Sequence, residues 1–298
     1  MSNCAVIDQA LLARELDRLI RRAVVNISAD TRQLLEEALE RETKPTARGM
    51  LQSMLENTRM AREGNMPVCQ SPGYPTVYVR FGDACLPGKL ADMLGAGVVQ
   101  ATAEGLLRPS IVHPLTRKNS GDNSGEGVPN YEWSYEPALD YLEIIASLKG
   151  CGAELGNAMR IMTVPQLGKQ NRGLKNFVLD TVIEAGGKPC PPVGIGIGIG
   201  GQMDVAAKLS RKAISTRLWT DNHPDPLYRQ LEEELLQEIN ALGLGAAGVG
   251  GETYALAVKI GAAATHTAIA PVAINFHCWV TRRGGVRIWP DGRVEDLF

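Results

Sequence analysis

The pattern of hydrophobic positions divides the chain into a helical beginning and a longer part in which strands and helices alternate. Between residues 11 and 20, leucine and isoleucine recur at helical spacing, which predicts an amphipathic helix. Asp30, followed by Gln33 three residues later, predicts the N-cap of a second helix. A third helix is expected over residues 46–63. Residues 7–63 as a whole are therefore expected to be helical.

From residue 64 onward, turn-rich segments separate predicted strands from predicted helices. β-Branched and aromatic residues indicate the strands, and amphipathic spacing indicates the helices. Residues 243–266 are expected to form a glycine-rich turn followed by a helix or a strand. The expected strands are residues 76–81, 131–137, 139–148 and 271–280, with a hairpin at 286–297, and the expected helices are 88–106, 173–186, 202–214 and 225–242.

This order of elements predicts the fold class. We expect an α/β fold of the mixed α+β kind, in which a helical N-terminal cap lies on a mixed-sheet body. The sequence contains neither an evident linker nor an internal repeat. We therefore expect one domain over residues 1–298, with a helical part at 1–63 and an α/β body at 64–298.

Charge and composition narrow the classes of partner. The formal net charge is −2 and only 5% of the residues are aromatic, which argues against a nucleic-acid partner. No apolar run reaches the roughly 18–20 residues that a membrane helix needs, so no membrane partner is expected. The N-terminus carries early acidic residues and lacks the apolar core of a signal peptide. We expect a cytoplasmic protein.

The glycine-rich segment Gly194–Gly201 invites a nucleotide-binding interpretation, because it follows a predicted strand and precedes a helix. Its glycines alternate with isoleucines, however, which is typical of a strand with one crowded face. No acidic residue stands about 20 positions later to bind a ribose. A Rossmann-type nucleotide binder therefore stays open only as a less favoured alternative. A serine nucleophile is also disfavoured, because the chain has no GxSxG motif.

Six cysteines occur without any CxxC pair, so a zinc ribbon is not expected. The simplest interpretation is that most of them are small buried hydrophobic residues. Cys69, Cys190 and Cys278 differ, because each lies next to proline or glycine or at a predicted strand end. Loops of this kind leave backbone N–H groups free to donate hydrogen bonds to the sulfur atoms of a cysteine-bound iron–sulfur cluster. Spacing alone does not show that the three thiols meet.

The segments around these cysteines, together with two others, resemble the α subunit of class I (iron–sulfur) fumarases and L(+)-tartrate dehydratases. The resemblance covers nearly the whole chain and is weakest over the first 45 residues. The shared order of the segments argues against a chance match. They are PVCQ at 67–70, LRPSIV at 107–112 with PLTRKNSGDN at 114–123, KGCGAE at 149–154, GGKPCPP at 186–192, and TH at 265–266 with PVAINFHC at 271–278.

The resemblance implies a hydro-lyase that reversibly dehydrates a 2-hydroxy dicarboxylic acid of the malate/fumarate or tartrate type. It implies a [4Fe-4S] cluster held by Cys69, Cys190 and Cys278, with one iron left open as a Lewis acid. The catalytic residues that it implies are Arg108, Gln70 and His266. The further substrate-binding residues that it implies are Ser71, Gly150, Cys151, Gly152, Asn119, Asp122 and Asn123.

The chain departs from the family pattern at two of these positions. Ser71 stands where the family usually has an acid, which puts the proton route in doubt. Cys151 stands where relatives often have glycine, so we do not expect it to be a fourth cluster ligand. The family's SEN after the glycine turn is also changed, to Ala153-Glu154-Leu155. Ser71 and Ala153 leave two alternatives open. One is a non-catalytic cluster-binding accessory subunit, and the other is a hydratase for a different acid such as citramalate or mesaconate.

The resemblance also implies a partner. Single-chain relatives carry a C-terminal domain that supplies the catalytic base, and the homology to this chain ends before that domain. We therefore expect a separate β subunit that carries the C-terminal catalytic domain, in an α2β2 heterotetramer.

Overall fold

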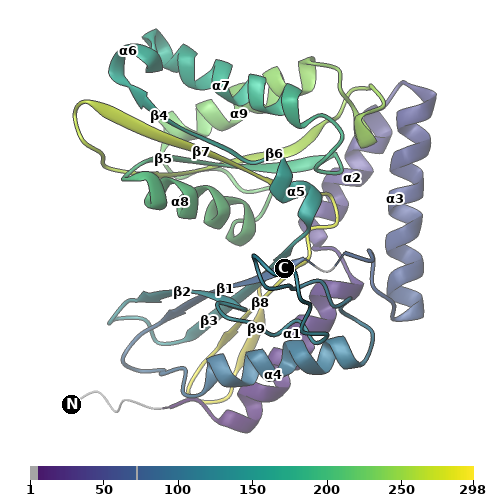
Figure 1. The fold of residues 1–298 in the computed structure, drawn as a ribbon, viewed down its shortest axis with the longest axis vertical. Coiled ribbons are helices and arrows are strands. Elements are labelled where there is room, and N and C mark those ends of the chain that lie inside the picture. The colour runs from purple at the N-terminus through teal and green to yellow at the C-terminus, as the bar shows by residue number, and fades with distance from the viewer. Residues whose placement is uncertain (1–5, 72) are drawn as a thin grey trace. The chain divides into compact units, whose positions relative to one another are not determined.

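The computed structural model describes residues 6–71 and 73–298, and these residues form helices and mixed sheets as expected for an α/β fold (Figure 1). The chain divides into two compact units that are interleaved in sequence. The first unit comprises Met1–Ser28, Asn57–Lys149 and Val280–Phe298, and the second comprises Ala29–Glu56 and Gly150–Trp279. The three predicted N-terminal helices are present, but they are shared between the units and form no separate unit.

The first unit is built on a five-stranded sheet with the strand order β2-β1-β3-β8-β9. Strands β1 and β2 are parallel, and the other neighbours are antiparallel. Helices α1 (Gln9–Val25) and α4 (Leu90–Ala103) bury their leucines against one face of this sheet. The strands are β1 (Tyr74–Phe81), β2 (Asn130–Tyr135), β3 (Leu142–Lys149), β8 (Arg283–Ile288) and β9 (Val294–Asp296).

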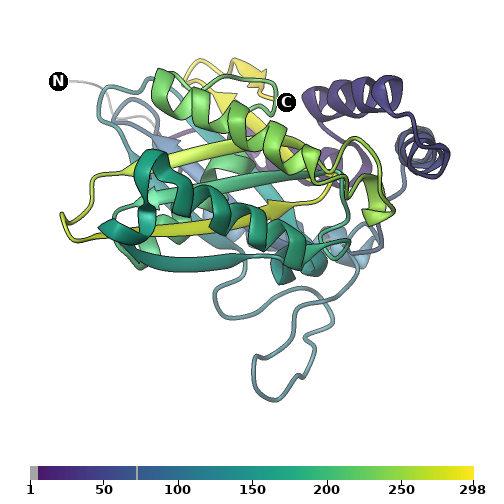
Figure 2. The same ribbon diagram turned by 90° about the horizontal axis from the view of Figure 1, so that it is seen from above.

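The second unit is built on a four-stranded sheet with the strand order β4-β7-β5-β6. Helices α7 and α9 lie side by side across one face of this sheet, and α8 covers the other (Figures 1 and 2). The strands are β4 (Ala158–Thr163), β5 (Val193–Gly200), β6 (Ala255–Ala263) and β7 (Ile269–His277), and the helices are α7 (Arg172–Ala185), α8 (Met203–Thr216) and α9 (Pro226–Ala241).

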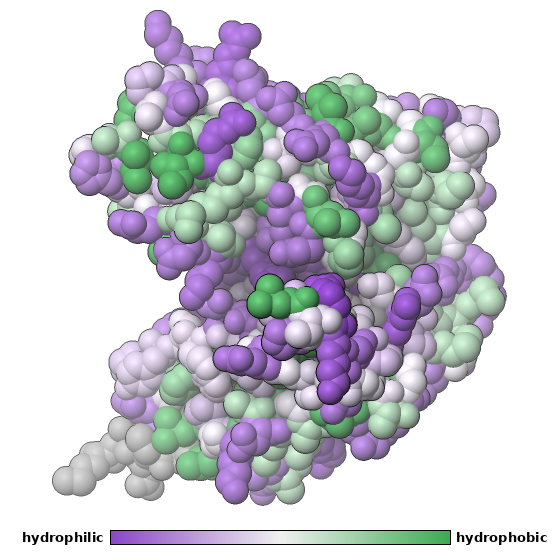
Figure 3. All heavy atoms as spheres, viewed as in Figure 1, coloured by the Kyte–Doolittle hydropathy of each residue, from purple (hydrophilic) through white to green (hydrophobic). Residues whose placement is uncertain are grey.

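The remaining elements are short or lie toward the N-terminus. They are α2 (Ala29–Arg41), α3 (Pro45–Gly64), α5 (Cys151–Leu155), α6 (Val164–Leu167) and two 3₁₀ turns at Lys169–Asn171 and Ala246–Gly248. Hydrophilic and hydrophobic side chains are interspersed on the face of each unit that Figure 3 draws. Within the described ranges 6–71 and 73–298, no helix has the length and apolar character needed to cross a bilayer.

Strand β5 explains the alternation of glycine and isoleucine. Ile195 and Ile197 are fully buried in the core formed with α7 and α9. The glycines face α8, and a Cβ added at Gly196 or Gly198 would lie 1.9 Å from the carbonyl oxygen of Ser210 or Ala206. The glycines therefore permit close packing of α8 on the sheet, as predicted for a strand with one crowded face.

Two local predictions are wrong or incomplete. Asp30 does not cap α2 from outside, because the helix already begins at Ala29. Its buried carboxylate instead accepts a hydrogen bond of 2.6 Å from the backbone N–H of Trp219 in the same unit. Strand β4 was not predicted, and its short sequence AMRIMT lies at a sheet edge with four of its six residues exposed. For residues 243–266 the sequence left a helix or a strand open, and the structure has the strand β6 there.

The crowded face of β5 can be tested with a pair of glycine substitutions. We expect Gly198→Ala to destabilise the protein by about 1–3 kcal/mol, because the added methyl group overlaps the backbone of α8. Gly95→Ala in α4 is the matched control, since its Cβ would meet no described atom within 4 Å. Gly95→Ala should stabilise the protein by about 0.5–1 kcal/mol. Urea unfolding of both variants checks the expectation, and a stable Gly198→Ala variant would contradict it.

Candidate functional site

Four segments of the first unit meet at one end of its sheet. The register pairs Tyr74 with Lys149, and it pairs Thr76 with Asn130. Strand β8 enters beside the same end of β3, since Ser147 pairs with Arg283. The segments before β1, before β2, after β3 and before β8 therefore converge there, and we call this edge the loop end of the first sheet. Neighbouring strands are about 4.8 Å apart, so these segments are close in space.

The segment before β1 carries three of the predicted site residues. Cys69 and Ser71 are half-buried, and Gln70 is exposed. The backbone of this segment is held to α3, because Asn57 donates a hydrogen bond of 2.9 Å to the carbonyl oxygen of Val68. Cys69 therefore directly follows a residue at the loop end, Val68, whose backbone is held by Asn57.

The loop between α4 and β2 is organised by Asn123, whose side chain is almost fully buried. Its Oδ1 accepts hydrogen bonds from the backbone N–H groups of Ser110 and Ile111, at 2.8 and 3.3 Å. Its Nδ2 donates to the hydroxyl of Thr102 at 2.9 Å and to the carbonyl oxygen of Arg108 at 3.1 Å. Asn123 has φ 60°, in the left-handed region that asparagine tolerates. The side chain of Asn123 thus holds the backbone at residues 108–111, at the start of the loop, against the segment around residue 123.

Arg108, Asn119 and Asp122 occupy more exposed places in this loop. The Arg108 side chain is exposed, while its carbonyl oxygen is held by Asn123. Asn119 accepts a hydrogen bond of 2.7 Å from the N–H of Gly121 and so closes a turn. Asp122 accepts from both the hydroxyl and the N–H of Ser124, and these bonds hold the pKa of its carboxyl group below the usual value. Asp122 therefore stays an anion engaged in its own turn.

The same loop surrounds a cavity of about 790 Å³ in the first unit. Its wall includes Asn119 from the predicted site, together with His113, Lys118 and Tyr74. The Tyr74 hydroxyl donates a hydrogen bond to the carbonyl oxygen of Gly127 and so closes one side of the loop. Neither His113 nor Lys118 was predicted from the sequence to have a role at the site. Their position in or beside the long polar loop is the only feature of the sequence that could have indicated such a role.

In the second unit, the predicted residues Cys190 and Cys278 lie at one end of the sheet. Strand β5 begins at Val193 and β7 ends at His277, and Gly194 pairs with His277 in antiparallel register. Cys190 therefore precedes one strand at the edge where Cys278 follows the other. Cys190 is exposed and has φ 56°, whereas Cys278 is buried. We call this edge the cysteine end of the second sheet.

The glycine turn at residues 150–152 lies against the same segment. A Cβ added at Gly152 would lie 2.4 Å from the carbonyl oxygen of Lys188, two residues before Cys190. Helix α5 begins directly after Gly150, with an exposed Cys151 at its first position. Its buried residue Ala153 belongs to the same core as Phe276 on β7. Within this unit, the predicted residues Gly150, Cys151 and Gly152 are thus brought toward the cysteine end.

His266 is placed elsewhere in the second unit. It lies in the exposed connection between β6 and β7, before the start of β7 at Ile269, whereas Cys278 follows the end of β7. A nine-residue strand is roughly 30 Å long, so the two residues lie at opposite ends of β7. A single chain therefore does not bring His266 to a ligand bound at Cys278.

The donor chemistry of the cysteines can be compared with that of a metal centre. Among the described cysteines, no disulfide forms between Cys69, Cys85, Cys151, Cys190 and Cys278. Burial raises the pKa of the Cys85 thiol to about 11, so Cys85 stays protonated and is a poor ligand. Cys69, Cys190 and Cys278 lie at segment ends, and their thiols fit a thiolate-ligated group. Within residues 6–71 and 73–298, no three His, Cys, Asp or Glu side chains converge as a preformed metal site.

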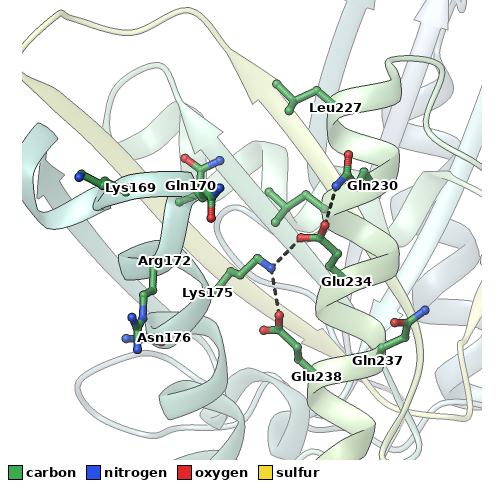
Figure 4. A pocket seen from close by; sticks show the side chains of 12 residues that line it. Lys169, Gln170, Arg172, Lys175, Asn176, Leu227, Gln230, Glu234, Gln237 and Glu238 are labelled. Atoms are coloured by element: carbon green, nitrogen blue, oxygen red, sulfur yellow. Dashed lines mark hydrogen bonds and ion pairs between the residues drawn. The ribbon is translucent and has the colours of Figure 1, made fainter.

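A second cavity of about 690 Å³ lies between α7 and α9 in the second unit (Figure 4). Lys175 contacts the carboxylates of Glu234 and Glu238 there, at 2.6 and 2.9 Å, and Gln230 donates to Glu234 at 2.7 Å. These contacts raise the pKa of Lys175 and lower that of Glu234. The predicted site residues do not line this cavity, and its central lysine is already bonded to two carboxylates.

Comparison with known proteins decides the family. A sequence profile of the fumarate hydratase (fumerase) family matches residues 13–287. The chain belongs to the fumarate hydratase family. It is 41% identical over 280 residues to a Methanocaldococcus jannaschii protein provisionally named L(+)-tartrate dehydratase subunit alpha, covering 93% of this chain and 97% of that protein. The family resemblance noted in the sequence is thereby confirmed.

This member of the fumarate hydratase family spans most of one further relative but only about half of another. The L(+)-tartrate dehydratase subunit alpha of Escherichia coli strain UTI89 is 33% identical over 264 residues, which is 88% of this chain and 86% of that protein. A Geobacillus stearothermophilus protein provisionally named fumarate hydratase class I is 33% identical over 286 residues. This match covers 94% of this chain but only 55% of that protein.

The anchoring role of Asn123 gives a test of the loop. We expect Asn123→Ala to destabilise the protein by about 1–3 kcal/mol, because the buried hydroxyl of Thr102 and the backbone N–H of Ser110 lose their hydrogen bonds. Asn119→Ala, whose side chain is exposed, should change stability by less than about 0.5 kcal/mol. Amide hydrogen exchange at Ser110 and Ile111 should accelerate only in the Asn123 variant. Equal exchange in both variants would contradict the anchoring role.

Proposed function

We propose that this chain is the α subunit of a [4Fe-4S]-dependent hydro-lyase that reversibly dehydrates a 2-hydroxy dicarboxylic acid of the malate/fumarate or tartrate type. One observation carries the proposal. The chain spans nearly the whole of a protein named as an α subunit, but only about half of a protein named as a class I fumarate hydratase. The family membership supports a hydro-lyase, and the name subunit alpha that two of the relatives carry supports a reaction divided between two subunits.

The proposed cluster ligands are Cys69, Cys190 and Cys278. Support comes from their place at the loop end of the first sheet and at the cysteine end of the second, and from the segments that carry the family resemblance. When bound, a [4Fe-4S] cluster with three cysteine ligands supplies a Lewis acid at its open iron, which can take the substrate hydroxyl and a carboxylate.

The chain's own polar residues would bind and orient the dicarboxylate. Arg108 is proposed to grip one carboxylate through a bidentate contact, and its backbone is held in place by Asn123. The N–H groups of residues 150–152 would donate to an anion, since they lie at a turn that leads into α5. Gln70 and Ser71 would approach from the segment that carries Cys69. Asn119 and Asp122 would shape the loop through their turns rather than by touching the reacting atoms.

The general base is proposed to come from a separate β subunit in an α2β2 assembly. A base must lie within hydrogen-bond reach of the proton that it removes. Ser71 occupies the position of the family acid and cannot act as a carboxylate base. His266 lies at the far end of β7 from Cys278, so it is not assigned that task within one chain. The relatives that are named as α subunits support such a partner.

The cluster proposal predicts a specific pattern of iron loss. Anaerobic reconstitution of the full-length chain should give a brown protein with about four iron and four sulfide per chain. Cys69→Ser, Cys190→Ser and Cys278→Ser should each lose most of that iron. Cys85→Ser is the matched control and should keep it, because Cys85 is buried with a raised thiol pKa. A colourless wild-type protein, or one that takes up only zinc, would contradict the proposal.

Because the catalytic base is proposed to come from the β subunit, we expect activity to depend on that subunit. The chain reconstituted alone should convert no dicarboxylate, whereas co-expression with a subunit that carries the family's C-terminal pattern should restore turnover. Absorbance assays with malate, L(+)-tartrate and citramalate would identify the substrate. Turnover by this chain alone would refute the need for a β subunit. An assembled pair that holds a cluster and converts none of these acids would instead support an accessory role.

A further inference from the structure

Arg282 is a buried arginine whose charge has no counterpart in the described structure. Its side chain is only 1% exposed. Among residues 6–71 and 73–298, no hydrogen-bond acceptor lies against its Nε or its Nη1. An arginine side chain keeps its proton even when it is buried. A buried charge that is left unpaired destabilises a protein, so such a group calls for an anion that binds to it.

Arg282 lies at the loop end of the first sheet. Its carbonyl oxygen accepts a hydrogen bond of 2.8 Å from the N–H of Leu148, which continues the ladder beyond the pairing of Ser147 with Arg283. Lys149, the next residue of β3, pairs with Tyr74 at the start of β1. Because adjacent strands are about 4.8 Å apart, the backbone of Arg282 is roughly 10 Å from the start of β1. The segment that carries Cys69 and Gln70 enters at that point.

The buried charges of the first unit are unevenly distributed. Lys149, Arg282 and Arg283 are buried cations at the loop end. The buried carboxylates described in this unit are Glu15 and Glu143, and both are occupied elsewhere. Glu15 binds Arg14 and Arg18 on α1. Glu143 binds Arg80 and Arg287 near the opposite end of β3. Neither of these buried carboxylates is therefore bonded to Arg282.

The neighbouring Arg283 shows what a structural arginine looks like at this place. Its guanidinium stacks on the ring of Phe298 at 4.5 Å and lies 3.4 Å from the hydroxyl of Ser28. Both arginines are buried to a similar degree. Only Arg283 has these partners, so the two residues have different roles despite their adjacency.

We propose that Arg282 binds a carboxylate group of the dicarboxylic acid substrate. The choice of a dicarboxylate rests on the proposed function, whereas the requirement for an oxyanion rests on the unpaired guanidinium itself. A planar guanidinium matches a carboxylate through two parallel hydrogen bonds, and burial strengthens that contact. Arg282 would thereby select dicarboxylates over monocarboxylates. Its burial means that the side chains covering it must move to admit the ligand, which is then held away from bulk water.

Thermal unfolding separates this role from a structural one. In the full-length chain without ligand, Arg282→Met should unfold at the same temperature as wild type or higher, because an apolar side chain replaces an unpaired buried charge. Arg283→Met is the matched control and should unfold at a lower temperature, because it loses the contacts with Phe298 and Ser28. If Arg282→Met is destabilised as much as Arg283→Met, the proposal is overturned.

Calorimetric titration of the full-length chain with malate, with acetate as the monocarboxylate control, tests the binding role. Arg282→Met should raise the dissociation constant for malate by about 10- to 100-fold, as expected when one charged hydrogen-bonding pair is lost. Arg282→Lys, which keeps the charge but not the planar fork, should give an intermediate value. Arg293→Met, an exposed arginine on the last hairpin, should leave malate affinity unchanged. Unchanged affinity in Arg282→Met overturns the proposal.

The two proposals fail in different ways. If the assembled enzyme dehydrates a dicarboxylate and Arg282→Met leaves both its KM and the malate affinity unchanged, the proposed function stands and the role of Arg282 falls. If the assembled enzyme converts no dicarboxylate, the proposed function falls. In that case a titration with sulfate still tests the oxyanion site, and loss of sulfate binding in Arg282→Met supports it.

Discussion

The antiparallel register of β1, β3 and β8 is the constraint on which the candidate site in the first unit depends. The pairings of Tyr74 with Lys149 and of Ser147 with Arg283 place four loops at one sheet edge. A shift of one residue would turn every side chain to the other face, and it would bury polar groups where Val77 and Ile144 now pack. The hydrophobic core therefore determines which loops meet, although no core residue belongs to the site.

Much of the fold could be predicted from the sequence, because long amphipathic helices and aliphatic strands carry strong periodic signals. The alternating glycines of β5 indicated a strand with one crowded face. The prediction of Asp30 as an N-cap failed because its carboxylate accepts a hydrogen bond from the backbone N–H of Trp219, which is 189 residues away in the sequence. Strand β4 was missed because a short edge strand has little burial to leave a pattern in its sequence. Both errors concern contacts that a local window of sequence does not contain.

The site was predicted unevenly for the same reason. The motifs identified the segments of Cys69, Cys190 and Cys278, since loops rich in proline and glycine are visible in sequence. The resemblance placed His266 among the catalytic residues, but the extended strand β7 separates it from Cys278. Arg282 was passed over because the sequence TRRGG is typical of an exposed turn. Its burial, and the different partners of Arg283, arise only when β8 pairs with β3.

The packing of α8 on β5 has a consequence for how sequences of this family should be compared. Gly196 and Gly198 have no room for any side chain, because the backbone of α8 fills the space that a Cβ would need. Homologues with the same helix-to-sheet spacing must keep glycine at these places whatever substrate they use. An alignment would then show these glycines as invariant, and the segment could be mistaken for a nucleotide-binding loop. Such invariance would record a steric limit on substitution and carry no information about chemistry.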